Sequence, residues 1–174
     1  MSTINGLPAH VLLVHAVVVL LPLSALLLVL TALWPAARHR LAGANALLAW
    51  GVTGLVPLTT EAGEWLERRV PGSVLVHEHA ELGDSAIFYA VPIAVLALLV
   101  WWRHREIIAA TGPGGAPERR TYLAPLSPAV TGMVAAAAIA VATTGVYGIY
   151  RIGDSGARAA WTGGVSTTGT GLPG

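Results

Sequence analysis

The sequence has no cysteine, no lysine and little charge of either sign. Without cysteine the chain forms no disulfide, thiolate metal site or c-type haem attachment, so His, carboxylate, Met or backbone groups must hold any metal or cofactor. Charged residues make up 11% of the 174 residues and the net charge is +1, which gives no indication of nucleic-acid binding. A soluble domain carries about 25% charged residues. Because this chain is also 55% hydrophobic, we expect it to lie largely in lipid.

Four apolar runs are long enough to cross a bilayer, which requires roughly 20 mostly apolar residues per helix. They predict an all-α membrane protein, a four-transmembrane-helix bundle, with helices at about 9–35, 41–66, 78–104 and 126–151. We assign residues 1–162 to this transmembrane domain and residues 163–174 to a flexible tail rich in Gly and Thr. The first run lacks a preceding basic segment and is longer than a signal-peptide core, so we interpret it as a retained helix.

Arginines are distributed unevenly over the connections, and this bias predicts the orientation in the membrane. The first and third connections together hold six arginines, and the other side of the membrane holds four. The six are Arg38, Arg40, Arg103, Arg105, Arg119 and Arg120. We therefore expect both termini to lie outside. The Gly- and Pro-rich stretch 111–117 neither follows a strand nor opens a phosphate-binding helix, so we interpret it as a flexible loop.

A weak internal repeat relates the two basic helix ends. The segments Trp34–Arg40 and Trp101–Arg105, which follow the first and third apolar runs, both end in Arg-His-Arg. Helices 1–2 and 3–4 therefore have the pattern of two parallel helix-pair repeats, related by an axis along the membrane normal. We interpret His39 and His104, which lie among these arginines, as interfacial anchors.

Ionisable groups gather at the outer end of the predicted bundle. His10 and His15 lie at the start of the first helix, Glu61 follows the second apolar run, and His79 and Asp84 precede the third. Ionisable groups at membrane depth are costly and are therefore candidates for function. When the first and third helices are aligned by their Arg-His-Arg ends, His15 falls level with His79 or Ala80. When they are aligned by the tryptophans at their ends, His79 falls level with His10, and His15 with Asp84.

Two chemistries are compatible with these residues. Two His on facing helices can be the axial ligands of a b-type haem, and His15 and His79 are the first candidates, with His10 as the substitute. His10 and His15 are about 140° apart around a helix, so the two cannot face one iron from an unbroken helix. The alternative is a divalent-metal or proton site formed by His15, His79, Glu61 and Asp84, because imidazole and carboxylate suit Zn, Fe or Cu. Ordinary polar residues at a wet membrane interface would give the same pattern without any ligand.

The segment Ala9–Val17 resembles the opening of a bacterial membrane family known only as domain of unknown function 2231. That opening reads roughly His-Pro-x-x-Val-His-Phe-Pro. The spacing of His10 and His15 matches, while the prolines that follow both histidines are missing here. His79 lies where the family has a His before its third helix.

The end of the chain carries a second likeness. The segment Arg151–Trp161 is similar to a terminal motif of actinobacterial members, in which a His often stands at the position of Asp154. This departure puts a ligand role for that position in doubt. The resemblance spans nearly the whole chain and implies four helices in a bacterial inner (cytoplasmic) membrane, with no established activity. It also implies a redox setting, because some relatives are fused to Rieske or cytochrome c domains.

Our leading functional hypothesis is electron transfer through a b-type haem near the outer face, with a Rieske or cytochrome-type redox partner. One alternative is a non-catalytic accessory subunit of a larger complex, which the small residues of the fourth helix suit. Another is a metal- or proton-linked transporter, which would have to oligomerise. We therefore expect an electron-transfer or accessory protein rather than an enzyme, in contact with the lipid bilayer.

Overall fold

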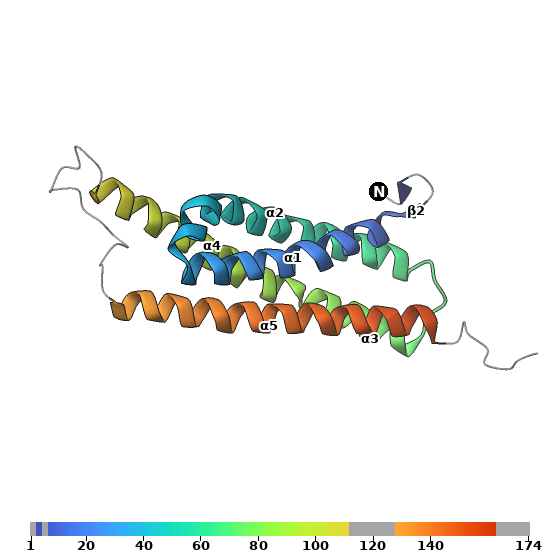
Figure 1. The fold of residues 1–174 in the computed structure, drawn as a ribbon. Helices are drawn as coiled ribbons and strands as arrows, with labels where there is room; N and C mark the ends of the chain where they lie inside the picture. Colours follow the sequence, from blue (N-terminus) through green and yellow to red (C-terminus); the bar gives the residue numbers. More distant parts are fainter. Residues whose placement is uncertain (1–2, 5–6, 112–127, 163–174) are drawn as a thin grey trace, which may run out of the picture.

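Residues 3–4, 7–111 and 128–162 are described by the computed structural model. The glycines and prolines of the predicted flexible loop 111–117 and the whole predicted tail 163–174 lie outside these described residues. Within them, the chain forms an elongated bundle in which long helices run side by side (Figure 1).

Five helices follow a short hairpin in the described residues. The strands β1 (Thr3–Ile4) and β2 (Leu7–Pro8) pair antiparallel, with Thr3 opposite Pro8. The helices are α1 (Ala9–Leu33), α2 (Pro35–Glu67), α3 (Val74–Asp84), α4 (Ala86–Thr111) and α5 (Pro128–Trp161). Four helical segments are long and apolar enough to cross a membrane: α1, α2, α5, and α3 together with α4. The predicted all-α bundle of four transmembrane helices is thereby confirmed.

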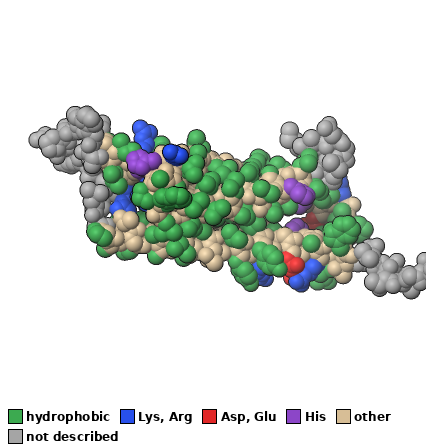
Figure 2. Space-filling model, in the orientation of Figure 1, with side chains coloured by type: hydrophobic (Ala, Val, Ile, Leu, Met, Phe, Trp, Pro, Cys, Tyr) green, Lys and Arg blue, Asp and Glu red, His purple; other side chains and the backbone are tan. Residues whose placement is uncertain are grey.

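The bundle core is formed mainly by alanines and a few large aliphatic side chains. The α1 helix packs against α2 and α5, and α4 packs against the same two helices. Leu21, Leu28 and Ile93 are almost fully buried at these contacts, among Ala25, Ala94 and other core alanines. Small residues let helix backbones approach closely, which is how helices associate in a lipid solvent. Large apolar side chains are instead exposed along the middle of the bundle, where lipid would cover them (Figure 2).

The helix boundaries differ from the predicted ones at the polar ends. The second helix begins at Pro35 instead of residue 41, because proline suits the first position of a helix. The third predicted helix, 78–104, is two helices in the structure, and it extends from Val74 to Thr111 with a break at Ser85. Ser73 begins α3 by accepting a hydrogen bond from the Val76 amide at 3.2 Å.

The fourth helix continues to Trp161 instead of ending near residue 151. An ion pair of 2.6 Å between Arg158 and Asp154, one helical turn apart, lies on its exposed side. Ser155 is buried on its inner side, where it contacts α3. The contact of Ser155 with His79 of α3 lies within this additional helical segment.

Candidate functional site

The two ends of the bundle carry different charges. We call the end formed by the start of α1, the end of α2, α3 and the end of α5 the acidic end, because it carries Glu61, Glu64, Glu67, Glu78, Glu81, Asp84 and Asp154. We call the opposite end the arginine end, and it carries Arg38, Arg40, Arg103 and Arg105. In Figure 2 the charged and His side chains lie near these two ends of the molecule, with hydrophobic side chains between them.

His10 lies in the first turn of α1 and docks on α2. Its Nδ1 lies 3.0 Å from the backbone carbonyl oxygen of Thr59. The ring also contacts Gly63, one turn further along α2, where an added Cβ would lie 2.9 Å from the ring Cε1. Any larger residue at position 63 would therefore push the imidazole away from the carbonyl that holds it.

His79 lies on α3 and docks on α5 in a similar manner. Its Nδ1 lies 3.0 Å from the hydroxyl oxygen of Ser155, which in turn donates to the carbonyl of Ile152 at 2.8 Å. An added Cβ on Gly156 would lie 2.9 Å from the His79 Cε1. Each imidazole thus has the same support, a hydrogen-bond acceptor for Nδ1 and a glycine beside the ring.

These contacts determine which nitrogen of each ring carries the proton. The Thr59 carbonyl is only an acceptor, so Nδ1 of His10 donates to it. The Ser155 hydroxyl uses its one hydrogen on Ile152, so its oxygen accepts from Nδ1 of His79. When each ring is neutral, Nε2 therefore has a free lone pair, as in His residues that bind a metal.

The two rings lie close together although they come from helices far apart in the sequence. Their centroids are 6.3 Å apart and their planes are inclined at 72°. Two imidazoles bound on opposite sides of one metal, with bonds of about 2 Å, have ring centres roughly 6 Å apart. The observed separation of the rings is compatible with such a pair.

The other predicted site residues are exposed at the surface. His15 is exposed on the surface of α1, and its Nδ1 contacts the Val11 carbonyl of the same helix. Glu61 and Asp84 are also exposed. Among the described residues, no group of three or more His, Asp or Glu side chains is placed to hold a metal ion. His10, which we had named only as a substitute, is the partner of His79.

Sequence reasoning missed the residues that support the pair. Gly63, Ser155 and Gly156 had no assigned role, although the last two lie inside the terminal motif, which singled out that segment. His104 was interpreted as an interfacial anchor, but it is only 9% exposed and its ring contacts that of His39 at a centroid distance of 4.4 Å.

A hollow of about 140 Å³ opens between α3 and α5, beside His79 of the His10–His79 pair, and Ser155 forms part of its lining.

The fold defines a multi-pass membrane protein, and the site consists of a His pair near one end of its helix bundle. The chain belongs to the family described as predicted membrane protein (DUF2231), whose profile matches residues 6–169. This match confirms the family that the segments at the two ends of the chain resemble. Comparisons with curated proteins and with solved structures gave no match.

Proposed function

We propose that His10 and His79 would hold a b-type haem, and that the protein would use it to transfer electrons near the outer face of the membrane. The observation that supports this proposal is the state of the two rings: each donates from Nδ1 to a fixed acceptor, and the ring centres are 6.3 Å apart. His with this support is a standard ligand of haem iron.

The number of ligands favours haem over a lone metal ion. A zinc site in a protein takes three or four protein ligands, while the described residues here offer a pair of His with no third ligand group beside it. A b-type haem brings four nitrogen ligands of its own, so two imidazoles complete the coordination of its iron. Two His on different helices are therefore a sufficient donor set for haem and an incomplete one for zinc.

The roles of the supporting residues follow from the contacts. The Thr59 carbonyl and the Ser155 hydroxyl hold both Nδ1–H groups and thereby keep both Nε2 atoms basic. Gly63 and Gly156 provide the space that each ring occupies against its helix. When bound, haem would supply one-electron redox chemistry.

The charge of the surface around His10 and His79 indicates what kind of redox partner would bind there. Glu61, Glu64, Glu78 and Glu81 are exposed at the acidic end, where seven acidic side chains outnumber Arg68, Arg69, Arg151 and Arg158. A surface with excess negative charge attracts positively charged proteins at long range. We take this end to lie outside, as the arginine bias predicts. We propose that a basic face of a Rieske or cytochrome-type protein meets the acidic end there. An association rate that falls steeply as salt is raised is the kinetic evidence that this partner proposal requires.

The test is the visible spectrum of the full chain, expressed with ample haem supply and purified in mild detergent. We expect a Soret band and sharp bands of reduced low-spin haem in the wild type, and their loss in His10→Ala and in His79→Ala. His15→Ala and His77→Ala are matched controls on the same two helices, because both side chains are exposed, and we expect unchanged spectra. A wild-type protein without a Soret band would contradict the proposal.

The same variants separate the alternatives. An accessory subunit would co-purify with a stoichiometric partner whether or not His10 and His79 are replaced. A metal- or proton-linked transporter built on His15, Glu61 and Asp84 would lose metal, measured by elemental analysis, when His15 is replaced. The haem proposal predicts that the His15→Ala variant is normal in both assays.

A further inference from the structure

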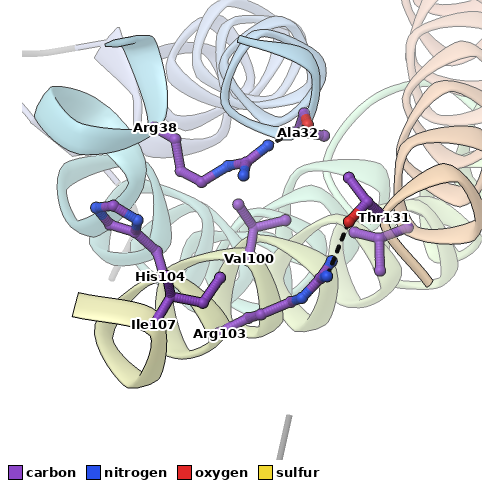
Figure 3. Close-up of a pocket in the computed structure, with 8 residues that line it drawn as sticks. Ala32, Arg38, Val100, Arg103, His104, Ile107 and Thr131 are labelled. Atoms are coloured by element: carbon purple, nitrogen blue, oxygen red, sulfur yellow. Dashed lines mark hydrogen bonds between the residues drawn. The ribbon is translucent and has the colours of Figure 1, made fainter. Parts of the chain in front are cut away.

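At the arginine end, far along the bundle from the His pair, basic side chains surround a hollow to which all four crossing helices contribute (Figure 3). Six of its lining residues matter here: Ala32, Arg38, Val100, Arg103, His104 and Thr131. None of the described residues that line it is acidic. The empty space of the hollow, including its open mouth, is about 280 Å³, and the volume that the centre of a water molecule can occupy is about 10 Å³, room for about one water molecule. A larger ligand would therefore lie in the mouth.

Arg38 is fixed by the turn between α1 and α2. Pro35 has no N–H, so the Thr31 carbonyl lacks its usual partner four residues later in the helix. The Arg38 Nε fills this role by donating to the Thr31 oxygen at 2.7 Å, and its Nη2 donates to the carbonyl of Ala32. The guanidinium is thereby held rigidly at the end of α1, facing the hollow.

Arg103 approaches the same hollow from α4. It is only 7% exposed, and its Nη2 donates to the Thr131 hydroxyl of α5 at 2.8 Å. Arg38 and Arg103 are close enough for their like charges to act on each other. In Figure 3 the Arg38 guanidinium points toward Ala32 and the Arg103 guanidinium toward Thr131, with Val100 between the two side chains. An anion in the mouth of the hollow would be attracted by both guanidiniums and would offset their mutual repulsion.

We propose that this hollow binds the phosphate group of an anionic phospholipid. Planar guanidinium groups match phosphate oxygens through paired hydrogen bonds, and basic pockets between membrane helices bind anionic headgroups. The position favours a lipid over a soluble phosphate, since Trp34 and Trp102 are exposed at the same end and such residues mark the headgroup layer. This site is separate from the His pair and does not depend on haem.

The experiment measures lipid binding to the purified full chain in mild detergent by native mass spectrometry. The probes are phosphatidylglycerol and phosphatidylcholine with identical acyl chains. We expect phosphatidylglycerol to bind about tenfold more tightly, and Arg103→Gln to weaken it about fivefold. Arg105→Gln, an equal loss of charge at an exposed position of the same helix, is the matched control, with a change of less than about twofold.

Three results would overturn the proposal. The first is equal affinity of the wild type for the two lipids, and the second is an equal loss in the Arg103→Gln and Arg105→Gln variants, which would indicate diffuse surface charge. The third is stabilisation of the protein by inorganic phosphate in the absence of phosphatidylglycerol, if the Arg103→Gln variant loses this stabilisation. That result would show that the hollow binds a soluble anion. If Arg103→Gln does not fold, Arg38→Lys keeps the charge but removes the planar fork, and unchanged lipid selectivity in that variant would also refute the proposal.

Discussion

Gly156 of α5 lies directly against the His79 ring, and its replacement by Ala tests how closely the site is fitted. The added Cβ would lie 2.9 Å from the ring Cε1 and 3.3 Å from both ring nitrogens. Non-bonded carbon atoms prefer about 3.5–4.0 Å, so the imidazole must retreat by roughly 0.6 Å or more. A retreat of this size takes the 3.0 Å bond between Nδ1 and the Ser155 hydroxyl to the limit of hydrogen bonding.

Two terms determine the size of the effect. Loss of the hydrogen bond costs about 1 kcal/mol, and overpacking costs about 1–3 kcal/mol. Gly→Ala within a helix gains about 1 kcal/mol by itself, so the comparison needs a control that shares this gain. Gly153 lies one turn earlier on α5, with no atom within 4 Å of an added Cβ. We expect the free energy of unfolding of the Gly156→Ala variant to be about 2 kcal/mol lower than that of the Gly153→Ala variant.

The assay is thermal or denaturant unfolding in detergent, followed by circular dichroism. In the His79→Ala background the two Gly→Ala variants should become equally stable, because the ring is gone. Haem affinity should fall about tenfold or more in Gly156→Ala, because the added methyl group disturbs the orientation of the His79 ligand. It should stay unchanged in Gly153→Ala. Equal stability and equal haem affinity of the two variants would refute the fitted contact between Gly156 and His79.

Two further predictions concern packing within the membrane. An added Cβ at Gly148 would lie 2.4 Å from the Tyr89 ring. The Gly148→Ala variant should therefore be about 1–3 kcal/mol less stable than Gly153→Ala in the same unfolding assay. In a Tyr89→Ala background this difference in stability should disappear. Ser24 and Asn45 are buried at the contact of α1 with α2, where the Ser24 hydroxyl lies 3.1 Å from the Asn45 side-chain amide. Replacing Asn45 by Leu should cost about 1 kcal/mol in reversible unfolding, and a stability equal to the wild type would show that this bond contributes nothing.

The number of crossings could be predicted because the bilayer imposes a length and an apolar composition on each spanning helix. The helix ends could not be predicted in the same way. At the membrane surface, segments such as Pro35–Arg40 and Arg151–Trp161 are equally compatible with loop or helix by composition. Their state depends on tertiary contacts, such as the packing of Ser155 against α3. The break at Ser85 has no proline or glycine at that position to indicate it.

The candidate site was predicted only in part. The sequence placed His10, His15 and His79 at one end, and one of two helix alignments put His10 level with His79. The choice between His10 and His15 requires the rotation of α1 about its axis. Because α1 is apolar on every side, its sequence has no polar face that would reveal this rotation. The contacts of His10 with Thr59 and Gly63 supply the missing information.

The most direct measurement is the electron paramagnetic resonance spectrum of the oxidised, haem-loaded protein. We expect a low-spin ferric signal in the wild type and in His15→Ala, because two imidazoles would ligate the iron. We expect a high-spin signal or loss of haem when either His10 or His79 is replaced by Ala, since each replacement removes one ligand. A low-spin signal that persists in both of these variants, or that disappears in His15→Ala, would contradict the assignment of His10 and His79 as the ligand pair.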